Sequence, residues 1–214
     1  MIKYILFDLD GTLTNPKEGI TKCVQYALRH FGIERECEEL TPFIGPPLKE
    51  QFMKYASLSE EEAIEAVRIY RERFAPIGLF ENEIYPGVLD MLKSLKEDGK
   101  ILALATSKPT VFAEKIVEKY GIAPYLEYIS GSELDGTNVE KSAVIRIAMD
   151  KLGAKPSETI IIGDRMHDAK GAEKNGIGCI GVSYGFAGEG ELEAAGVKII
   201  ADKPQDIVPI LKKM

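Results

Sequence analysis

Residues 2–12 of the chain read IKYILFDLDGT, a mostly apolar run, Ile2–Phe7, that leads directly into the polar segment DLDGT. The run has the pattern of a buried strand, and ligands of open parallel sheets bind at the carboxyl ends of strands. Asp8 and Asp10 lie one residue apart at such an end. A contribution to stability explains these two acids poorly, because both carboxylates cannot be buried and ionised without a cation between them. A plain Asp-Gly turn is the alternative interpretation.

Short apolar runs alternate with helical patterns along most of the chain, which is typical of a parallel sheet covered by helices on both faces. Further strands are expected at Ile101–Ala105, Tyr128–Ser130, Thr159–Ile162, Cys179–Val182 and Ile199–Ile200. Helices are expected to begin at Pro86, near Thr110 and near Lys141, and to stop at Gly99, Gly121 and Gly153. The sequence therefore predicts an α/β fold.

Residues 16–80 interrupt this alternation. Apolar residues recur at helical spacing over Ile20–Phe31 and again over Ala63–Phe74, where a capping box precedes them. Between these stretches, Thr41–Pro47 is too rich in Pro and Gly to be helical. We therefore expect residues 16–80 to form a small helical insertion in a core domain made of residues 1–15 and 81–214.

Three later segments also carry candidate functional residues. Thr106 and Ser107 follow a buried strand, where a hydroxyl can donate to an anion, although a surface loop is the alternative. Lys141 opens a helix, where a cation opposes the helix dipole unless it faces a phosphate or carboxylates; a solvated lysine is the alternative. Asp164 and Asp168 belong to GDRMHD, which follows another buried strand. The four segments together, in this order, are stronger evidence for a functional site than any one of them alone.

The order DLDGT, strand-terminal Thr106, Lys141 and GDRMHD resembles the four motifs of haloacid dehalogenase superfamily phosphatases, and the match spans the whole chain. The resemblance implies a Rossmann-like parallel sheet with a helical cap that is inserted after the first motif and covers the active site. The insertion at 16–80 lies where such a cap would be.

The resemblance also implies the catalytic residues. Asp8 is expected to be the nucleophile that takes the phosphoryl group. Asp10 is expected to protonate the leaving oxygen and then to deprotonate the attacking water. Thr106, Ser107 and Lys141 are expected to bind the phosphoryl oxygens.

A magnesium ion is implied as the cofactor. Asp8, the main-chain carbonyl of Asp10 and Asp164 are expected to hold Mg²⁺, with water and a phosphate oxygen completing an octahedron. Asp168 is expected either to hold metal-bound waters or to brace Lys141. Neighbouring Arg165 and His167 fill positions that are often small or polar in relatives, and the sequence assigns them no role.

The expected reaction is hydrolysis of a small phosphate monoester. Segments such as Phe43–Pro47, Gly131–Gly136 and Lys108-Pro109 resemble a branch described as phosphoglycolate-phosphatase-like or 5′-nucleotidase-like. Specificity is expected to come from the cap, around Phe43–Leu48 and the face near Lys17–Thr21.

The same scaffold also supports other functions. A sugar-phosphate mutase similar to β-phosphoglucomutase shares all four motifs and stays open as an alternative. A non-catalytic phosphate-binding regulatory protein is a second alternative, but it would be expected to have lost Asp8 or Asp10. A 2-haloacid dehalogenase would not need Asp10, and no cap lysine is singled out for the Schiff base of a phosphonate hydrolase.

Composition limits the partners and the compartment. With 27 basic and 34 acidic residues the net charge is −7, and no basic block favours a nucleic-acid polymer or an anionic membrane. Three cysteines without a metal-ligand pattern are expected to be reduced thiols. No signal peptide and no apolar stretch of roughly 20 residues is visible. We expect a cytoplasmic protein, monomeric or homodimeric, that acts on a small-molecule phosphate ester.

Overall fold

A computed structural model describes residues 1–214, which divide into two compact units. The first unit comprises residues 1–14 and 84–214, and the second comprises residues 15–83. The assignment of the second unit as a cap over an active site stays a prediction. None of the helices combines the length and the apolar character that a membrane-spanning helix needs.

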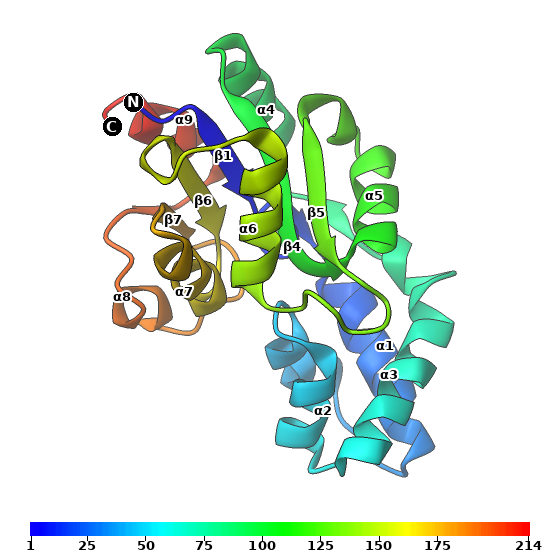
Figure 1. The fold of residues 1–214 in the computed structure, drawn as a ribbon. Coiled ribbons are helices and arrows are strands. Elements are labelled where there is room, and N and C mark those ends of the chain that lie inside the picture. Colours follow the sequence, from blue (N-terminus) through cyan, green and yellow to red (C-terminus); the bar gives the residue numbers. More distant parts are fainter. The chain divides into compact units, whose positions relative to one another are not determined.

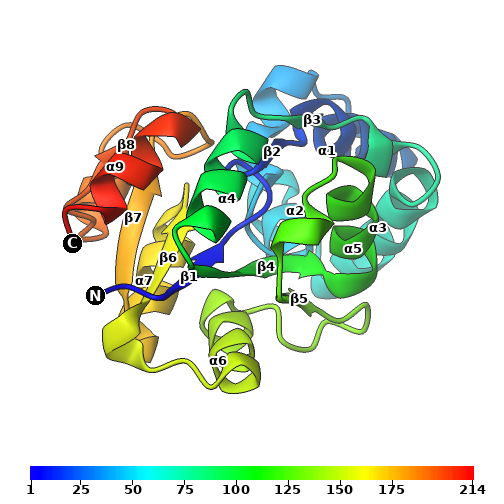
Figure 2. The same cartoon turned by 90° about the horizontal axis from the view of Figure 1, so that it is seen from above.

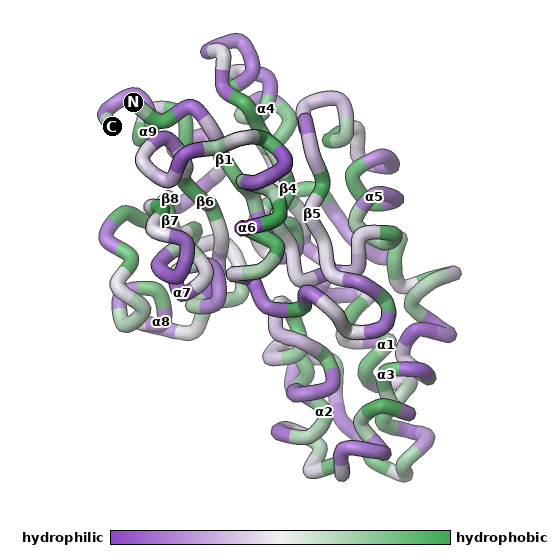
Figure 3. Tube along the Cα trace, in the orientation of Figure 1, coloured by the Kyte–Doolittle hydropathy of each residue, from purple (hydrophilic) through white to green (hydrophobic).

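A six-stranded sheet lies at the centre of the first unit, in the order β5-β4-β1-β6-β7-β8 (Figure 1). Its strands are β1 (Tyr4–Phe7), β4 (Ile101–Pro109), β5 (Tyr128–Ser132), β6 (Thr159–Gly163), β7 (Gly178–Val182) and β8 (Ile200–Ala201). Each neighbouring pair is parallel. The central strands are apolar, as the green trace of β1 and β4 shows (Figure 3), and all four residues of β1 are buried. The predicted parallel α/β fold is confirmed.

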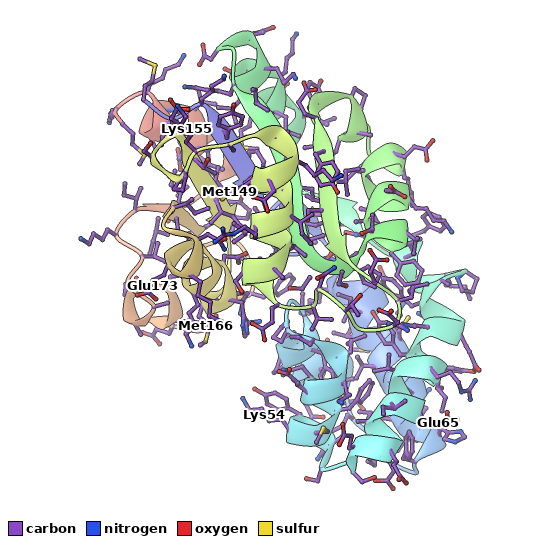
Figure 4. The ribbon with its side chains drawn as sticks, viewed as in Figure 1. Lys54, Glu65, Met149, Lys155, Met166 and Glu173 are labelled. Atoms are coloured by element: carbon purple, nitrogen blue, oxygen red, sulfur yellow. The ribbon has the colours of Figure 1, made fainter.

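Helices cover both faces of this sheet, with α6 and α4 on opposite sides (Figure 2). The helices are α4 (Val88–Glu97), α5 (Thr110–Lys119), α6 (Lys141–Leu152), α7 (Met166–Asn175), α8 (Glu191–Ala194) and α9 (Ile207–Leu211). Short 3₁₀ turns occupy Ala123–Tyr125, Pro156–Glu158 and Pro204–Asp206. On α6, Met149 (Figure 4) joins Val144 and Ile145 in a buried cluster with Leu6 and Ile161 of the sheet. Burial of these side chains fixes α6, and therefore its first residue, against β1 and β6.

The second unit is helical. It contains α1 (Lys17–His30), α2 (Leu48–Ala56) and α3 (Glu60–Phe74), with 3₁₀ turns at Cys37–Phe43 and Gly78–Phe80. The predicted capping box is present at the start of α3, where the amide of Glu62 donates to Ser59 Oγ at 3.3 Å and the amide of Ser59 donates to Glu62 Oε2 at 2.8 Å. Helix α2 was not anticipated by the sequence pattern.

One expectation for this unit was wrong. Thr41–Phe43 belong to a 3₁₀ helix rather than to a non-helical loop. A 3₁₀ turn needs only i to i+3 hydrogen bonds, such as that from the amide of Ile44 to the carbonyl of Thr41 at 3.0 Å, and it can include Pro42. The helical conformation ends where the Gly-Pro-Pro segment begins at Gly45, whose φ of 100° favours glycine.

The chain passes between the two units twice, and a two-stranded sheet lies at these crossings. It pairs β2 (Thr14–Asn15) with β3 (Glu83–Ile84). Within the first unit, the amide of Tyr85 donates to the carbonyl of Leu13 at 3.1 Å. This hydrogen bond joins the two segments of the first unit that border the second unit.

Candidate active site

The register of the central strands brings three of the sequence motifs to one edge of the sheet. Phe7 pairs with Leu104 on β4 and with Ile162 on β6. Because the three strands are parallel, the residues that follow them emerge together at their carboxyl ends. The amide of Asp8 donates to the carbonyl of Ile162 at 2.9 Å, which holds the start of the DLDGT loop against the end of β6.

Lys141 connects two of the buried acids. Its Nζ lies 2.7 Å from Asp8 Oδ1 and 3.0 Å from Asp168 Oδ1, and it donates to the carbonyl of Ala105 at 3.0 Å. Burial alone would lower the pKa of Lys141, but the carboxylates of Asp168 and Asp8 raise it above its usual value, so the lysine is a cation. Three oxygens surround an ammonium that has three N–H groups. A phosphate oxygen would therefore have to share or replace one of these partners.

Three carboxylates gather in a group that could hold a metal ion. Asp8, Asp164 and Asp168 are buried, and one oxygen of each lies within 4.8 Å of the others. Asp164 Oδ2 accepts the amide of Phe186 at 2.7 Å, whereas Asp164 Oδ1 is buried without a hydrogen-bond partner. Burial, followed by the charges of Asp168 and Asp8, raises the pKa of Asp164 well above its usual value. A buried, partnerless carboxylate oxygen beside two further acids fits a hard divalent cation.

Asp10 belongs to a second ion pair rather than to this acidic group. Asp10 Oδ2 lies 2.7 Å from Lys108 Nζ, and both side chains are buried. Burial raises the pKa of Asp10 above its usual value although Lys108 opposes the shift. The sequence drew attention to Lys108 only through the Lys-Pro pair, and it gave no signal that Lys108 would contact Asp10.

Thr106 and Ser107 lie inside β4 rather than after it, because the strand continues to Pro109. The pairing with β5 shifts between Ala105 and Pro109, so the expected strand end is instead an irregularity within the strand. Thr106 is buried and its Oγ1 accepts the amide of Lys108 at 3.3 Å. Hydrogen-bond or metal-ligand distances join the side chains of Asp8, Lys141, Asp164 and Asp168, whereas no hydrogen bond joins Thr106 or Ser107 to them.

The loop after β7 supports the site; Tyr184-Gly185 in this loop resembles the same phosphatase branch, but the sequence did not indicate the supporting role. Tyr184 donates its hydroxyl to the carbonyl of Thr12 at 3.0 Å, and Phe186 donates its amide to Asp164. Glu191 accepts from Arg165 Nε at 2.8 Å and from the amide of Met166, the first residue of α7 (Figure 4), at 2.9 Å. Arg165 therefore forms an ion pair with Glu191, which ties the loop to the start of α7.

Substitution of Gly185 should weaken metal binding. A Cβ at Gly185 would lie 2.3 Å from Asp164 Cβ and 2.5 Å from the carbonyl oxygen of Gly11, so Gly185→Ala must displace the acid. We expect the Mg²⁺ concentration that gives half-maximal activity to rise at least about tenfold, since a supporting residue of this kind is worth about 10–100-fold in metal affinity.

The matched control is Gly188→Ala in the same loop, where a Cβ would meet nothing closer than Glu191 Oε2 at 3.7 Å. Magnesium titrations of phosphate release and of thermal unfolding would compare the two variants. Equal magnesium dependence in both would contradict the supporting role of this loop.

The segments expected to give specificity lie in the second unit and are partly in its core. Phe43 is buried and its ring packs edge-on against Phe52, with centroids 5.1 Å apart, so its side chain supports the fold of the unit. Lys17, Glu18 and Thr21 line a cavity of about 350 Å³ within the second unit. Its other lining residues are Asn15, Lys22, Cys37, Glu38, Glu81, Asn82 and Glu83.

Comparisons with known proteins agree with these observations. The chain is 49% identical over 191 residues to a 5′-nucleotidase of Pseudomonas aeruginosa, covering 89% of this chain and 86% of the relative. It is 26% identical over 215 residues to phosphoglycolate phosphatase 1 of the same organism, covering 97% and 79%. It is also 35% identical over 183 residues to the tyrosine-protein kinase PtkA of Mycobacterium tuberculosis, but it spans only 62% of that relative.

A solved structure has the same fold over the whole chain. The crystal structure of a predicted phosphatase from Clostridium acetobutylicum matches with a TM-score of 0.97 and 45% identity, covering 100% of both chains. The family model for haloacid dehalogenase-like hydrolases matches residues 5–182. The chain belongs to the haloacid dehalogenase-like hydrolases and is a phosphatase of that family.

Proposed function

We propose that the chain hydrolyses a small phosphate monoester through an aspartyl-phosphate on Asp8. The observation that carries the proposal is the buried group of Asp8, Asp164 and Asp168 around Lys141, at the carboxyl end of the central strands. Such a concentration of buried charge is costly for stability, and it is explained if the group binds a phosphoryl substrate and a cation.

In the first half of the reaction, a carboxylate oxygen of Asp8 attacks the phosphorus atom. The ester P–O bond breaks, its electron pair stays on the leaving oxygen, and Asp10 gives a proton to that oxygen. The ion pair with Lys141 fixes the Asp8 side chain for the attack. The raised pKa of Asp10, caused by burial, supports its holding this proton.

In the second half, the same residues act in reverse. Asp10 accepts a proton from a water molecule, whose oxygen attacks phosphorus as the bond to Asp8 breaks. Inorganic phosphate leaves and both carboxyl groups return to their starting states. Lys141 offers its positive charge to the phosphoryl oxygens, and we assign Thr106 and Ser107 as further donors to them.

Mg²⁺ is the proposed cofactor, held by Asp8, Asp164 and the main-chain carbonyl of Asp10. When bound, it would supply positive charge to the phosphoryl oxygens. Asp168 braces Lys141 in this assignment, because Asp168 Oδ1 lies 3.0 Å from Lys141 Nζ.

We propose a nucleoside 5′-monophosphate as the first substrate to test and phosphoglycolate as the second. The 5′-nucleotidase of Pseudomonas aeruginosa, at 49% identity, supports this order over phosphoglycolate phosphatase 1, at 26%. We further propose that the second unit recognises the leaving group, through the cavity that Lys17, Glu18 and Thr21 line.

Release of phosphate from a panel of monophosphates tests the function. We expect hydrolysis of at least one nucleoside 5′-monophosphate, loss of activity with a chelator, recovery with Mg²⁺ and poor support by Ca²⁺, whose larger and looser shell misplaces the reacting atoms. Full activity after exhaustive chelation would contradict the metal assignment. Activity confined to phosphoglycolate would reverse the order of substrates.

A further inference from the structure

Lys108 is a buried cation whose position depends on a β-bulge. From Ala105 to Pro109, β4 advances four residues while its partner β5 advances only from Ser130 to Ser132. Bulges of this kind commonly lie next to active sites, where they change the direction of a side chain. A buried ammonium at such a place needs a partner of opposite charge.

Two hydrogen bonds and a close approach of β5 hold this part of β4. The hydroxyl of Ser132 donates to the carbonyl of Ser107 at 2.8 Å, and the amide of Lys108 donates to Thr106 Oγ1 at 3.3 Å. A Cβ at Gly131 would lie 2.6 Å from the carbonyl oxygen of Lys108, so only glycine lets β5 approach this closely. The backbone of Lys108 is therefore held from two sides.

The Lys108 side chain is directed at Asp10. Lys108 Nζ lies 2.7 Å from Asp10 Oδ2, and the two side chains are 6% and 9% exposed. The other oxygen, Asp10 Oδ1, is buried without a hydrogen-bond partner. One oxygen of Asp10 is thus bound to Lys108, and the other has no hydrogen-bond partner and is the oxygen left to exchange a proton.

We propose that Lys108 is a positioning residue that orients Asp10, so that Oδ1 exchanges the proton in the phosphatase reaction; this rests on the function proposed above. The proton on Oδ1 passes to the leaving oxygen as the ester P–O bond breaks, and Oδ1 later takes a proton from the attacking water. Lys108 takes part in neither proton transfer and acts through Asp10.

The test compares two leaving groups in Lys108→Met, which keeps much of the side-chain length and removes the charge. The nucleoside released from a nucleoside 5′-monophosphate is a poor leaving group that needs the proton, whereas 4-nitrophenyl phosphate releases a stabilised anion that needs it little. Because a positioned general acid contributes about 10²–10⁴-fold, we expect kcat/KM to fall at least about 100-fold for the nucleotide and less than about tenfold for the aryl ester.

Three controls separate positioning from structure. Lys108→Arg, which retains the charge, should recover most of the nucleotide activity. Lys115→Met, which removes an exposed lysine of α5, should leave both esters unchanged. In an Asp10→Asn background, Lys108→Met should cause no further fall, because a residue that acts only through Asp10 has nothing left to orient.

A fall of the same factor for both esters, or full additivity with Asp10→Asn, would overturn the proposal. If Lys108→Met does not fold, Lys108→Gln provides the same comparison with a neutral donor. Failure of the proposed function itself gives different results. Either the wild-type protein hydrolyses neither ester, or a variant with Asp8 replaced keeps the wild-type turnover.

Discussion

Asp8→Asn is expected to lower turnover by at least about three decades, which corresponds to roughly 4 kcal/mol of barrier at about 1.4 kcal/mol per decade. The amide has nearly the shape of the carboxylate but cannot attack phosphorus. Folding should survive, because the substitution removes one charge from a buried group of three acids. Steady-state phosphate release together with circular dichroism measures both properties.

Asp150→Asn is the matched control, because Asp150 is an exposed acid on α6. It should keep wild-type turnover under the same conditions. A folded Asp8→Asn protein with turnover close to that of wild type would remove Asp8 from the mechanism.

Lys141→Met is expected to have the largest effect on stability. Asp8 and Asp168 would lose the cation that lies 2.7 and 3.0 Å from their oxygens, with Asp164 still close by. Removal of one partner from a buried ion pair typically costs about 3–5 kcal/mol in the free energy of unfolding. Urea denaturation in the presence of a chelator measures this cost.

Magnesium should restore part of the stability lost in Lys141→Met, because a bound cation would again compensate the three acids. Lys151→Met, an exposed substitution on the same helix, should change the unfolding free energy by less than about 0.5 kcal/mol. If Lys141→Met also changes the unfolding free energy by less than about 0.5 kcal/mol, Lys141 does not compensate the charges of these acids.

Local patterns explain what could be predicted from the sequence. Buried parallel strands such as Tyr4–Phe7 are continuous apolar runs, and the topology of such sheets places their following residues at one edge. This is why the pattern could place Asp8 and Asp164 at one edge, whereas the association of Lys141 and Asp168 with them came from the family resemblance. The helix α7 was harder to recognise, because it packs through small residues such as Ala169 and Ala172 rather than through an apolar stripe.

The interactions that the sequence did not predict join residues far apart in the chain. Lys108 contacts Asp10 across 98 positions, and its orientation depends on a glycine in another strand, Gly131. Asp164 accepts a hydrogen bond from the main-chain amide of Phe186. Because almost any residue type supplies a main-chain amide, the sequence does not reveal such a donor. Such contacts depend on strand register and loop path, which short motifs do not contain.

The central claim is that Asp8 carries the phosphoryl group, and the most direct measurement is to trap that group on the Asp10→Asn variant. With 4-nitrophenyl phosphate the first step needs little acid catalysis, whereas the second lacks its base, so the intermediate should accumulate. After acid quenching and borohydride reduction, mass spectrometry of the tryptic peptide Tyr4–Lys17 should locate one modified residue, Asp8. Release of nitrophenol without modification of Asp8, or modification of another residue, would contradict the account.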